Sequence, residues 1–244
     1  MVLRMVRRLE AGELDVAICV TEGLVAGIGD NGMKLFGTYV DTPLPWAVSV
    51  KHGSKYASLD DLAFGATFGV SRNGSGSDIM ARYMGSHFEW PGAPRTCVLG
   101  DINGLIRGVQ SGEADAFLWE RTTMQRHYAK SEVAYLGTVR PPWPAFSYAA
   151  LGPFIRENPE RLRLFVRWAR EMAAEFMRGI EGNRAFVCRE FGYSSEDVDA
   201  WAAYVGFSED GRVDRGRIEK AILALERAGV VNGLGVDDVV MTPE

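Results

Sequence analysis

Short apolar runs alternate with segments of helical periodicity along most of the first 150 residues. The run LDVAICV (14–20) predicts a strand, and ATFGVS, TCVLG and ADAFLW predict further strands beyond it. Strands that alternate with helices of about ten residues are typical of a mainly parallel sheet flanked by helices. From Pro153 onward the pattern is almost wholly helical. The chain is therefore predicted to be α/β.

Two stretches rich in proline and aromatic residues interrupt this pattern, DTPLPW (41–46) and RPPWPAF (140–146). Proline favours extended backbone, so both stretches are predicted to cross between lobes as hinges. The predicted organisation is one discontinuous lobe (1–45 and 145–244) into which a second lobe (46–144) is inserted. The residues expected to form the hinges are Pro43, Pro45, Trp46, Pro144 and Phe146.

An internal repeat favours two related lobes. VRRLEAGELDVAI (6–18) aligns with IRGVQSGEADAFL (106–118), with Gly12 matching Gly112 and Asp15 matching Asp115. Junctions of this kind also arise by chance, because glycine is common just beyond a helix. Taken as a repeat, the two segments predict pseudo-symmetric lobes with a ligand cleft between them.

The segment VSRNGSGSDIMARYM (70–84) predicts a strand, a glycine-serine loop and a helix in immediate succession. Hydroxyl groups beside the unpaired N–H groups of a first helical turn favour a carboxylate, sulfonate or phosphate. A plain capped turn with Ser77 as the N-cap is the alternative interpretation. The candidate ligand residues in this loop are Ser71, Arg72, Asn73, Gly74, Ser75, Gly76 and Ser77. The GKS/T ending of a nucleotide P-loop and a GxGxxG signature are absent.

Two other predicted strand ends carry candidate ligand residues, since open α/β sheets bind ligands at that edge. Thr21 and Glu22 follow the first strand, and Trp119, Glu120 and Thr122 follow the strand of the second repeat. Trp119 could stack on a flat ligand, with a core position as the alternative. Trp143, on the second crossing, is expected either to line the cleft or to pack in the hinge.

Composition and charge narrow the function. Hydrophobic residues make up 47% and charged residues 24% of the 244 residues, which is an ordinary globular profile. The net charge of −5 argues against a nucleic-acid surface, which needs a concentrated basic face. No run approaches the ~20 apolar residues of a membrane span, so no membrane insertion is expected. No signal peptide pattern opens the chain, so a cytoplasmic location is expected for the chain as written.

Motifs for catalysis or metal binding are absent. The three cysteines (Cys19, Cys97 and Cys188) lack metal or redox spacing and are expected to be buried thiols. The three histidines (His52, His87 and His127) have no nucleophile or carboxylate at a recognisable spacing. HExxH and GxSxG motifs do not occur. We therefore expect no enzyme, no metal and no cofactor.

The segments GELDVAI, SRNGSGSDIMARYM, GEADAFLWERTT and ENPERLRLFVRWA resemble the SsuA/THI5/NMT1-like substrate-binding proteins. The likeness runs from about Leu9 to Phe191 and is strongest to the Candida binding-protein-like branch. It implies a type II periplasmic-binding-protein fold that captures a small anionic or aromatic, heterocyclic solute between its lobes. It further implies an ABC-transporter permease as a partner, and ligand contacts at Thr21, Glu22, the loop 71–77 and Trp119–Glu120.

Two departures from the family pattern bear on this resemblance. The cysteine-rich CCCFC motif of the thiamine-pyrimidine synthases is missing, which disfavours that enzyme as the alternative function. Family members begin with a strand and a helix ahead of GELDVA, so the first lobe is expected to be truncated. A leader lost with that part would place the protein in the periplasm. A ligand-sensing effector domain is the third alternative, although no helix-turn-helix segment precedes the lobes.

Overall fold

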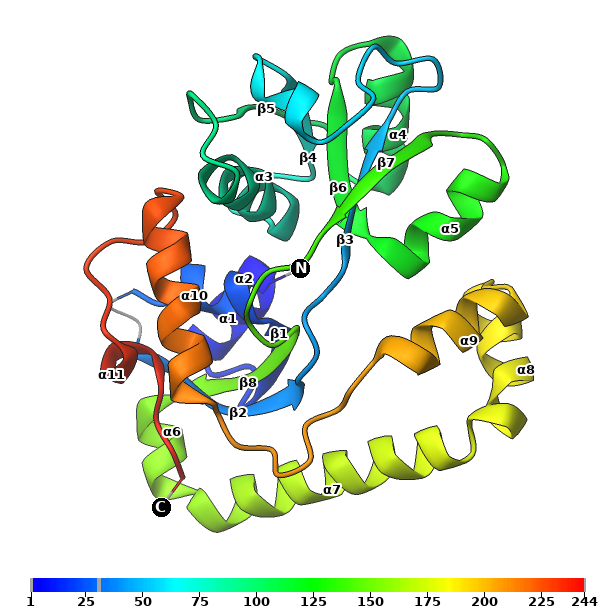
Figure 1. Cartoon of the computed structure of the whole chain (residues 1–244). Coiled ribbons are helices and arrows are strands. Elements are labelled where there is room, and N and C mark those ends of the chain that lie inside the picture. The colour runs from blue at the N-terminus through cyan, green and yellow to red at the C-terminus, as the bar shows by residue number, and fades with distance from the viewer. Residues whose placement is uncertain (1, 30–31, 244) are drawn as a thin grey trace. The chain divides into compact units, whose positions relative to one another are not determined.

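The computed structural model describes residues 2–29 and 32–243, apart from the side chain of Leu3, and divides into two compact units (Figure 1). Unit 1 comprises Met1–Pro43, Pro142–Ile222 and Gly233–Glu244, and unit 2 comprises Leu44–Pro141 and Leu223–Asn232. The chain changes unit after residues 43 and 141, whereas the crossings were expected after residues 45 and 144. Residues 223–232, which we expected in the first lobe, group with unit 2.

The sheet of unit 1 has three strands in the order β1-β8-β2: β1 (Ala17–Val20), β8 (Phe146–Leu151) and β2 (Met33–Val40). The strand β8 pairs antiparallel with both neighbours, placing Ala149 opposite Ala17 on one side and Leu35 on the other. This differs from the mainly parallel sheet that we expected. The reason is that β8 returns from the second crossing in the opposite direction and lies between β1 and β2.

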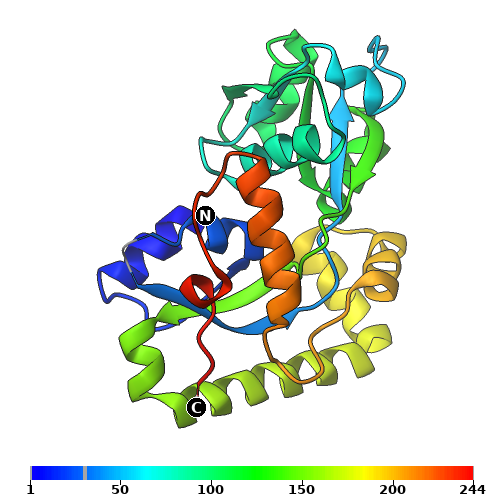
Figure 2. The ribbon, with the colours of Figure 1, turned by 60° about the vertical axis from the view of Figure 1, so that its left-hand side comes forward.

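Helices cover this sheet (Figure 2). The longest of them, α7, passes along the sheet, and α8 and α9 continue the chain beyond it. Buried Phe36, Tyr148 and Leu162 join strand and helix in one core cluster, and Phe36 stacks on Tyr148 with ring centroids 5.7 Å apart. The helices that begin in unit 1 are α1 (Val2–Glu10), α2 (Thr21–Ala26), α6 (Gly152–Glu157), α7 (Pro159–Arg178), α8 (Ile180–Phe191), α9 (Ser195–Tyr204), α10 (Arg215–Arg227) and α11 (Val236–Val239).

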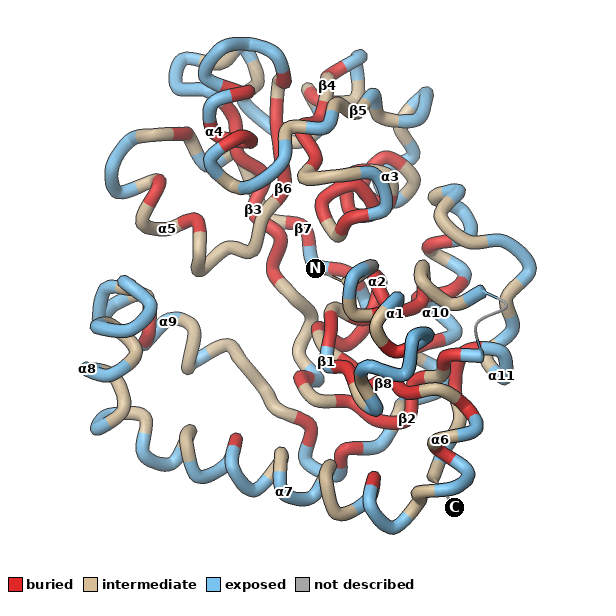
Figure 3. The backbone as a smooth tube through the Cα atoms, turned by 180° about the vertical axis from the view of Figure 1, so that it is seen from behind, coloured by how far each residue is buried: buried red, intermediate tan, exposed pale blue. Residues whose placement is uncertain are grey.

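Unit 2 has a mixed five-stranded sheet in the order β5-β4-β6-β3-β7. The strand β4 pairs in parallel with β5 and β6, whereas β3 pairs antiparallel with β6 and β7. Its strands are β3 (Trp46–Val50), β4 (Thr67–Val70), β5 (Arg95–Val98), β6 (Ala116–Glu120) and β7 (Ala134–Val139). The helices are α3 (Gly76–His87), α4 (Ile102–Ser111) and α5 (Arg121–Ala129), with a short 3₁₀ turn over Asp60–Ala63. In unit 2 every residue of β3 and most residues of α3 are buried, whereas neither β5 nor the α8 helix of unit 1 has a buried residue (Figure 3).

The repeated segments form equivalent turns. In each segment a helix is followed by a glycine in the left-handed conformation. Gly12 follows α1 with φ of 68°, and Gly112 follows α4 with φ of 83°. The chain then enters β1 or β6. Only glycine adopts such backbone at little cost, so the repeated glycine has a structural reason.

A methyl group at Gly104 is expected to destabilise unit 2. A Cβ atom there would overlap the backbone carbonyl oxygen of Leu99 in the turn before α4. Because a backbone atom cannot move aside as a side chain can, we expect Gly104→Ala to lower the free energy of unfolding by about 2–3 kcal/mol. Urea denaturation measures this change. Gly92→Ala is the matched control, since nothing lies within 4 Å of its Cβ position; equal stability of both variants would contradict the packing described.

Candidate functional site

The loop between β4 and α3 is organised by its own serine side chains. The N-cap of α3 is Ser75, whose Oγ accepts the N–H of Asp78 at 3.4 Å. The alternative with Ser77 as the N-cap is therefore wrong. Instead, the Oγ of Ser77 accepts the N–H of Ser71 at 3.0 Å and lies 3.0 Å from the Oγ of Ser75. The two hydroxyl groups thus tie the end of the strand to the start of the helix.

A carboxylate from the first turn of α3 completes the loop. Asp78 is buried, and its Oδ2 accepts the N–H of Gly74 at 2.8 Å, where φ is 69°. Its Oδ1 accepts the Nε–H of Arg82 at 3.2 Å, one turn along the helix. A negative charge near a helix N-terminus is favourable, and Arg82 compensates it locally. The loop is consequently held in one conformation without any ligand.

The outer part of the loop is more accessible. Arg72 is half-buried, and Asn73 and Gly74 are exposed. Among the residues that the structure describes, no ion pair engages the guanidinium group of Arg72. Arg72 therefore adds a positive charge next to the loop, which suits an anionic group.

In unit 1, the residues after β1 form a buried polar cluster with β8 and the second crossing. Thr21 and Glu22 begin α2 and are fully buried. The Oγ1 of Thr21 lies 2.8 Å from the Oγ of Ser147, and the backbone N–H of Thr21 donates to the carbonyl of Ala145 at 3.0 Å. Trp143, also fully buried, donates its Nε1–H to the Oε2 of Glu22 at 3.0 Å. Three predicted site residues, Thr21, Glu22 and Trp143, therefore lie in one cluster.

The carboxyl group of Glu22 is shifted strongly toward its neutral form. Burial raises the pKa of Glu22 from an ordinary value of 4.5 to about 7, against the hydrogen bonds from its own backbone and from Trp143. Desolvation disfavours the charged form of a carboxyl group, and here it outweighs those hydrogen bonds. Near neutral pH, Glu22 is present in both protonation states.

Glu120 caps the helix that follows it. Its carboxylate accepts the backbone N–H groups of Thr122 at 2.6 Å and Thr123 at 2.7 Å, and also the hydroxyl of Thr123 at 2.7 Å. Trp119 is partly buried and packs against the core cluster of unit 2 that contains Phe117. Ligand contacts at Trp119, Glu120 and Thr122 stay a prediction. A ligand that contacts Glu120 would have to bind a carboxylate that already accepts the hydrogen bonds of the helix cap.

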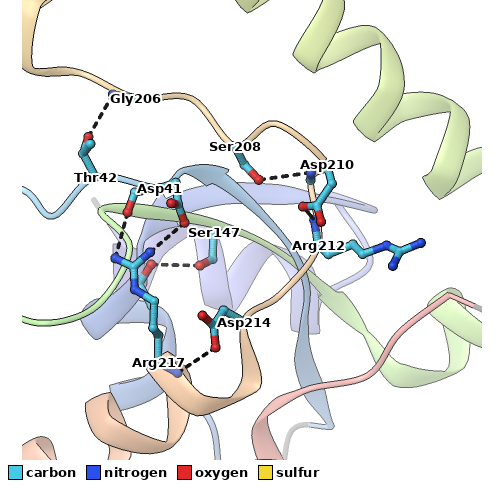
Figure 4. Close-up of polar contacts among 11 residues, drawn as sticks. Asp41, Thr42, Ser147, Gly206, Ser208, Asp210, Arg212, Asp214 and Arg217 are labelled. Carbon is cyan, nitrogen blue, oxygen red and sulfur yellow. Dashed lines mark hydrogen bonds and ion pairs between the residues drawn. The ribbon is translucent and has the colours of Figure 1, made fainter.

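The first crossing is fastened by residues that the sequence did not single out. Arg217 of α10 donates through Nη1 to the Oδ1 of Asp41 at 2.7 Å and through Nη2 to its backbone carbonyl at 2.8 Å (Figure 4). Thr42 accepts the N–H of Gly206 at 3.0 Å, and the hydroxyl of Tyr204 donates to the carbonyl of Pro43. The end of the first crossing in unit 1 is thus attached to the segment that connects α9 with α10.

The remaining predicted hinge residues take up positions at strand starts and in the crossings. Trp46 opens β3 and is buried, and Phe146 opens β8 and is half-buried. The carbonyl of Pro45 accepts the N–H of Arg121 at 2.9 Å. Pro144 lies in the short segment between Trp143 and β8. Bending at these positions stays a prediction.

Histidines and cysteines form no metal-binding group in the part of the chain that the structure describes. His127 pairs through Nδ1 with the Oε2 of Glu132 at 2.5 Å, and His87 stacks on Tyr83. No cluster of three His, Cys, Asp or Glu side chains suitable for a metal occurs within residues 2–29 and 32–243. Cys19 is buried, but Cys97 and Cys188 are only half-buried, contrary to the expectation that all three are buried. Within the same ranges, none of the helices has the length and apolar character of a membrane span.

Comparisons with known proteins identify the fold. The family model described as Ca3427-like PBP matches residues 46–139. The Candida albicans CA3427 gene product, which exhibits the generic periplasmic-binding-protein fold, superposes with a TM-score of 0.88 and 23% identity over 98% of this chain and 83% of its own. No curated protein matches the sequence at a significant level.

Two sulfonate-binding proteins superpose at lower identity. The periplasmic aliphatic sulphonate binding protein SsuA of Escherichia coli gives a TM-score of 0.72 with 16% identity, covering 99% of this chain and 80% of its own. The alkanesulfonate-binding protein SsuA of Xanthomonas axonopodis pv. citri, bound to MOPS, gives 0.78 with 12% identity, covering 98% and 84%. The chain thus has the two-lobed type II periplasmic-binding-protein fold, which confirms the predicted fold class and the resemblance to SsuA-like proteins.

The raised pKa of Glu22 predicts a specific pH dependence of stability. Because the folded state holds this proton more tightly than the unfolded chain, the free energy of unfolding should fall as the pH rises from 4.5 to about 7. The full loss is about 3 kcal/mol. Glu22→Gln keeps an acceptor for Trp143 and removes the charge, so it should abolish this decline in urea denaturation between pH 4.5 and 8.

The matched control is Glu219→Gln, on the exposed surface of α10. It should keep the pH dependence of the wild type. A Glu22→Gln variant that loses stability with rising pH as steeply as the wild type would show that Glu22 is not the responsible group.

Proposed function

We propose that this protein is a solute-binding protein that captures a small molecule carrying an anionic group, and that the loop Ser71–Ser77 anchors that group. The observation that carries the proposal is the combination of a preorganised serine loop at the start of a 12-residue helix with the uncompensated charge of Arg72. Backbone N–H groups, hydroxyl groups and a guanidinium group in one place are the usual partners of a sulfonate, carboxylate or phosphate.

The negative charge of Asp78 would repel an anion at this loop, but its hydrogen-bond and ion-pair partners compensate that charge. Its carboxylate is buried, accepts the N–H of Gly74 and is paired with Arg82. The charge of Asp78 is therefore balanced within the helix, while Arg72 is left to interact with a solute. Electrostatics at the loop consequently favour an anion, with Ser75 and Ser77 fixing its orientation.

The proteins of similar fold support binding rather than catalysis. Two of them are sulfonate-binding proteins, one with MOPS bound. Trp119, which is half-buried, would supply a flat surface for an aromatic or heterocyclic part of the solute, whereas Trp143 is fully buried and donates its indole N–H to Glu22. An ABC-transporter permease is the partner that this function implies. Capture between the two lobes, and a periplasmic or cytoplasmic location, stay predictions from the sequence.

A thermal-shift panel of small sulfonates, carboxylates and phosphates tests the proposal. A solute that raises the Tm would then be titrated by calorimetry against wild type and the double variant Ser75→Ala, Ser77→Ala. Because charge-assisted hydrogen bonds contribute about 1.5–3 kcal/mol, we expect the Kd to rise at least tenfold.

The double variant also loses a helix cap, so affinities have to be compared rather than melting temperatures. Ser86→Ala, at the opposite end of the same helix, is the control and should leave the Kd unchanged. An unchanged Kd in the double variant would remove the loop from the binding site. A panel in which no compound stabilises the protein would contradict the binding function itself.

A further inference from the structure

Trp46 carries a buried hydrogen-bond donor for which the described residues provide no acceptor. The side chain opens β3 in unit 2 and is 6% exposed, and its indole Nε1–H has no hydrogen-bond partner among the described residues. An indole N–H group can only donate, and buried indole groups usually find an acceptor. The acceptor for Trp46 is therefore expected to come from a water molecule or a ligand.

Trp46 lies at the edge of the sheet from which the serine loop leaves. The strand β4 runs into the loop Ser71–Ser77, and β6, which is parallel to β4, ends at Glu120. Trp46 pairs with Glu120 across the antiparallel strands β3 and β6. In the strand order β4-β6-β3, the backbone of Trp46 lies two strands from the end of β4, which corresponds to about 10 Å.

Trp46 also lies on the face of the sheet that α3 covers. Its neighbour Ala47 packs with Phe117 in the core cluster formed with α4 and α5. Side chains alternate between the two faces along a strand, so Trp46 lies on the face opposite to these helices. The helix α3 packs against β4 and β6 on the side of the sheet away from α4 (Figures 1 and 3). The indole and the first turn of α3 therefore share one face and one edge of the same sheet.

The loop and the indole offer a ligand different chemistry. The hydroxyl groups of Ser75 and Ser77 and the charge of Arg72 suit an oxyanion. The Nε1–H of Trp46 is a single uncharged donor, which suits a carbonyl, ether or hydroxyl oxygen. The rest of the ring is apolar and would contact the carbon atoms beside that oxygen.

We propose that the indole N–H of Trp46 donates to an uncharged oxygen of the bound solute, at a distance from the anionic group that the loop holds. The inference rests on the proposed function and narrows its substrate class to acids that carry a second, neutral acceptor several bonds away. An analogue without that oxygen leaves a buried donor unpaired, so Trp46 is a specificity-determining residue.

Matched pairs of acids that differ in one carbonyl group test the assignment. 4-Acetylbenzenesulfonate is compared with 4-isopropylbenzenesulfonate, and 6-oxoheptanoate with 6-methylheptanoate, by calorimetric titration of the full chain. In wild type we expect the ketone of at least one pair to bind about fivefold more tightly than its hydrocarbon partner, or better. Trp46→Phe keeps an aromatic ring and removes the donor, so the preference for the ketone should disappear.

Trp90→Phe is the matched control in the same unit. The indole N–H of Trp90 is likewise buried without a partner among the described residues. However, Trp90 follows the C-terminal end of α3 and stacks on Phe68, with ring centroids 5.9 Å apart. It is therefore remote from the first turn of α3, and Trp90→Phe should preserve the preference for the ketone.

A second measurement does not depend on the folding of a variant. In wild-type protein labelled with ¹⁵N, the ketone should move the assigned indole resonance of Trp46 further than its hydrocarbon partner does at saturation. Equal affinities within both pairs, a preference that survives in Trp46→Phe, a preference lost equally in Trp90→Phe, or an indole resonance that responds equally to both members would each overturn the assignment.

The outcomes separate this inference from the proposed function. If the acids bind without any preference for the ketones, the role of Trp46 is refuted and the binding function stands. If no acid of either kind binds, both are refuted.

Discussion

The insertion of β8 between β1 and β2 is the constraint on which unit 1 depends. The chain leaves this unit after Pro43 and returns at Pro142, and the returning strand supplies the hydrogen bonds to both neighbours. The same strand brings Ser147 against Thr21, and the residues just before it place Trp143 against Glu22. The buried polar cluster therefore depends on the return of the chain to unit 1, because two of its members precede the inserted unit in the sequence and two follow it.

The starts of helices α3 and α5 in unit 2 depend instead on hydrogen bonds between residues that are close in the sequence. Ser75, Ser77 and Asp78 fix the start of α3, and Glu120 alone fixes the start of α5. Each of these bonds joins residues no more than six positions apart in the sequence. A loop that is already ordered loses little conformational entropy on binding, which makes it suitable as an anchor.

Features of the fold that depend on neighbouring residues could be predicted from the sequence, whereas features that depend on distant contacts could not. The repeat, the succession of strand and helix, and the loop before α3 could be predicted because they depend on periodicity and neighbouring residues. The N-cap was misassigned, although Ser75 followed three residues later by Asp78 is a signature of a helix start. The antiparallel pairing of Ala17 with Ala149 and the contact of Arg217 with Asp41 could not be predicted, because no local pattern encodes them.

Among the acidic residues at helix starts, Asp78, Glu120 and Glu22 differ in how fully their carboxylates are hydrogen-bonded. Asp78 has a backbone donor and an arginine, and Glu120 has two backbone donors and a hydroxyl group. Glu22 has the Trp143 indole N–H on one oxygen, and its other oxygen has no hydrogen-bond partner among the described residues. The first two arrangements are complete as stabilising devices. Only the third leaves a carboxyl oxygen without a hydrogen bond inside a core of described residues, where desolvation raises the pKa of Glu22 to about 7.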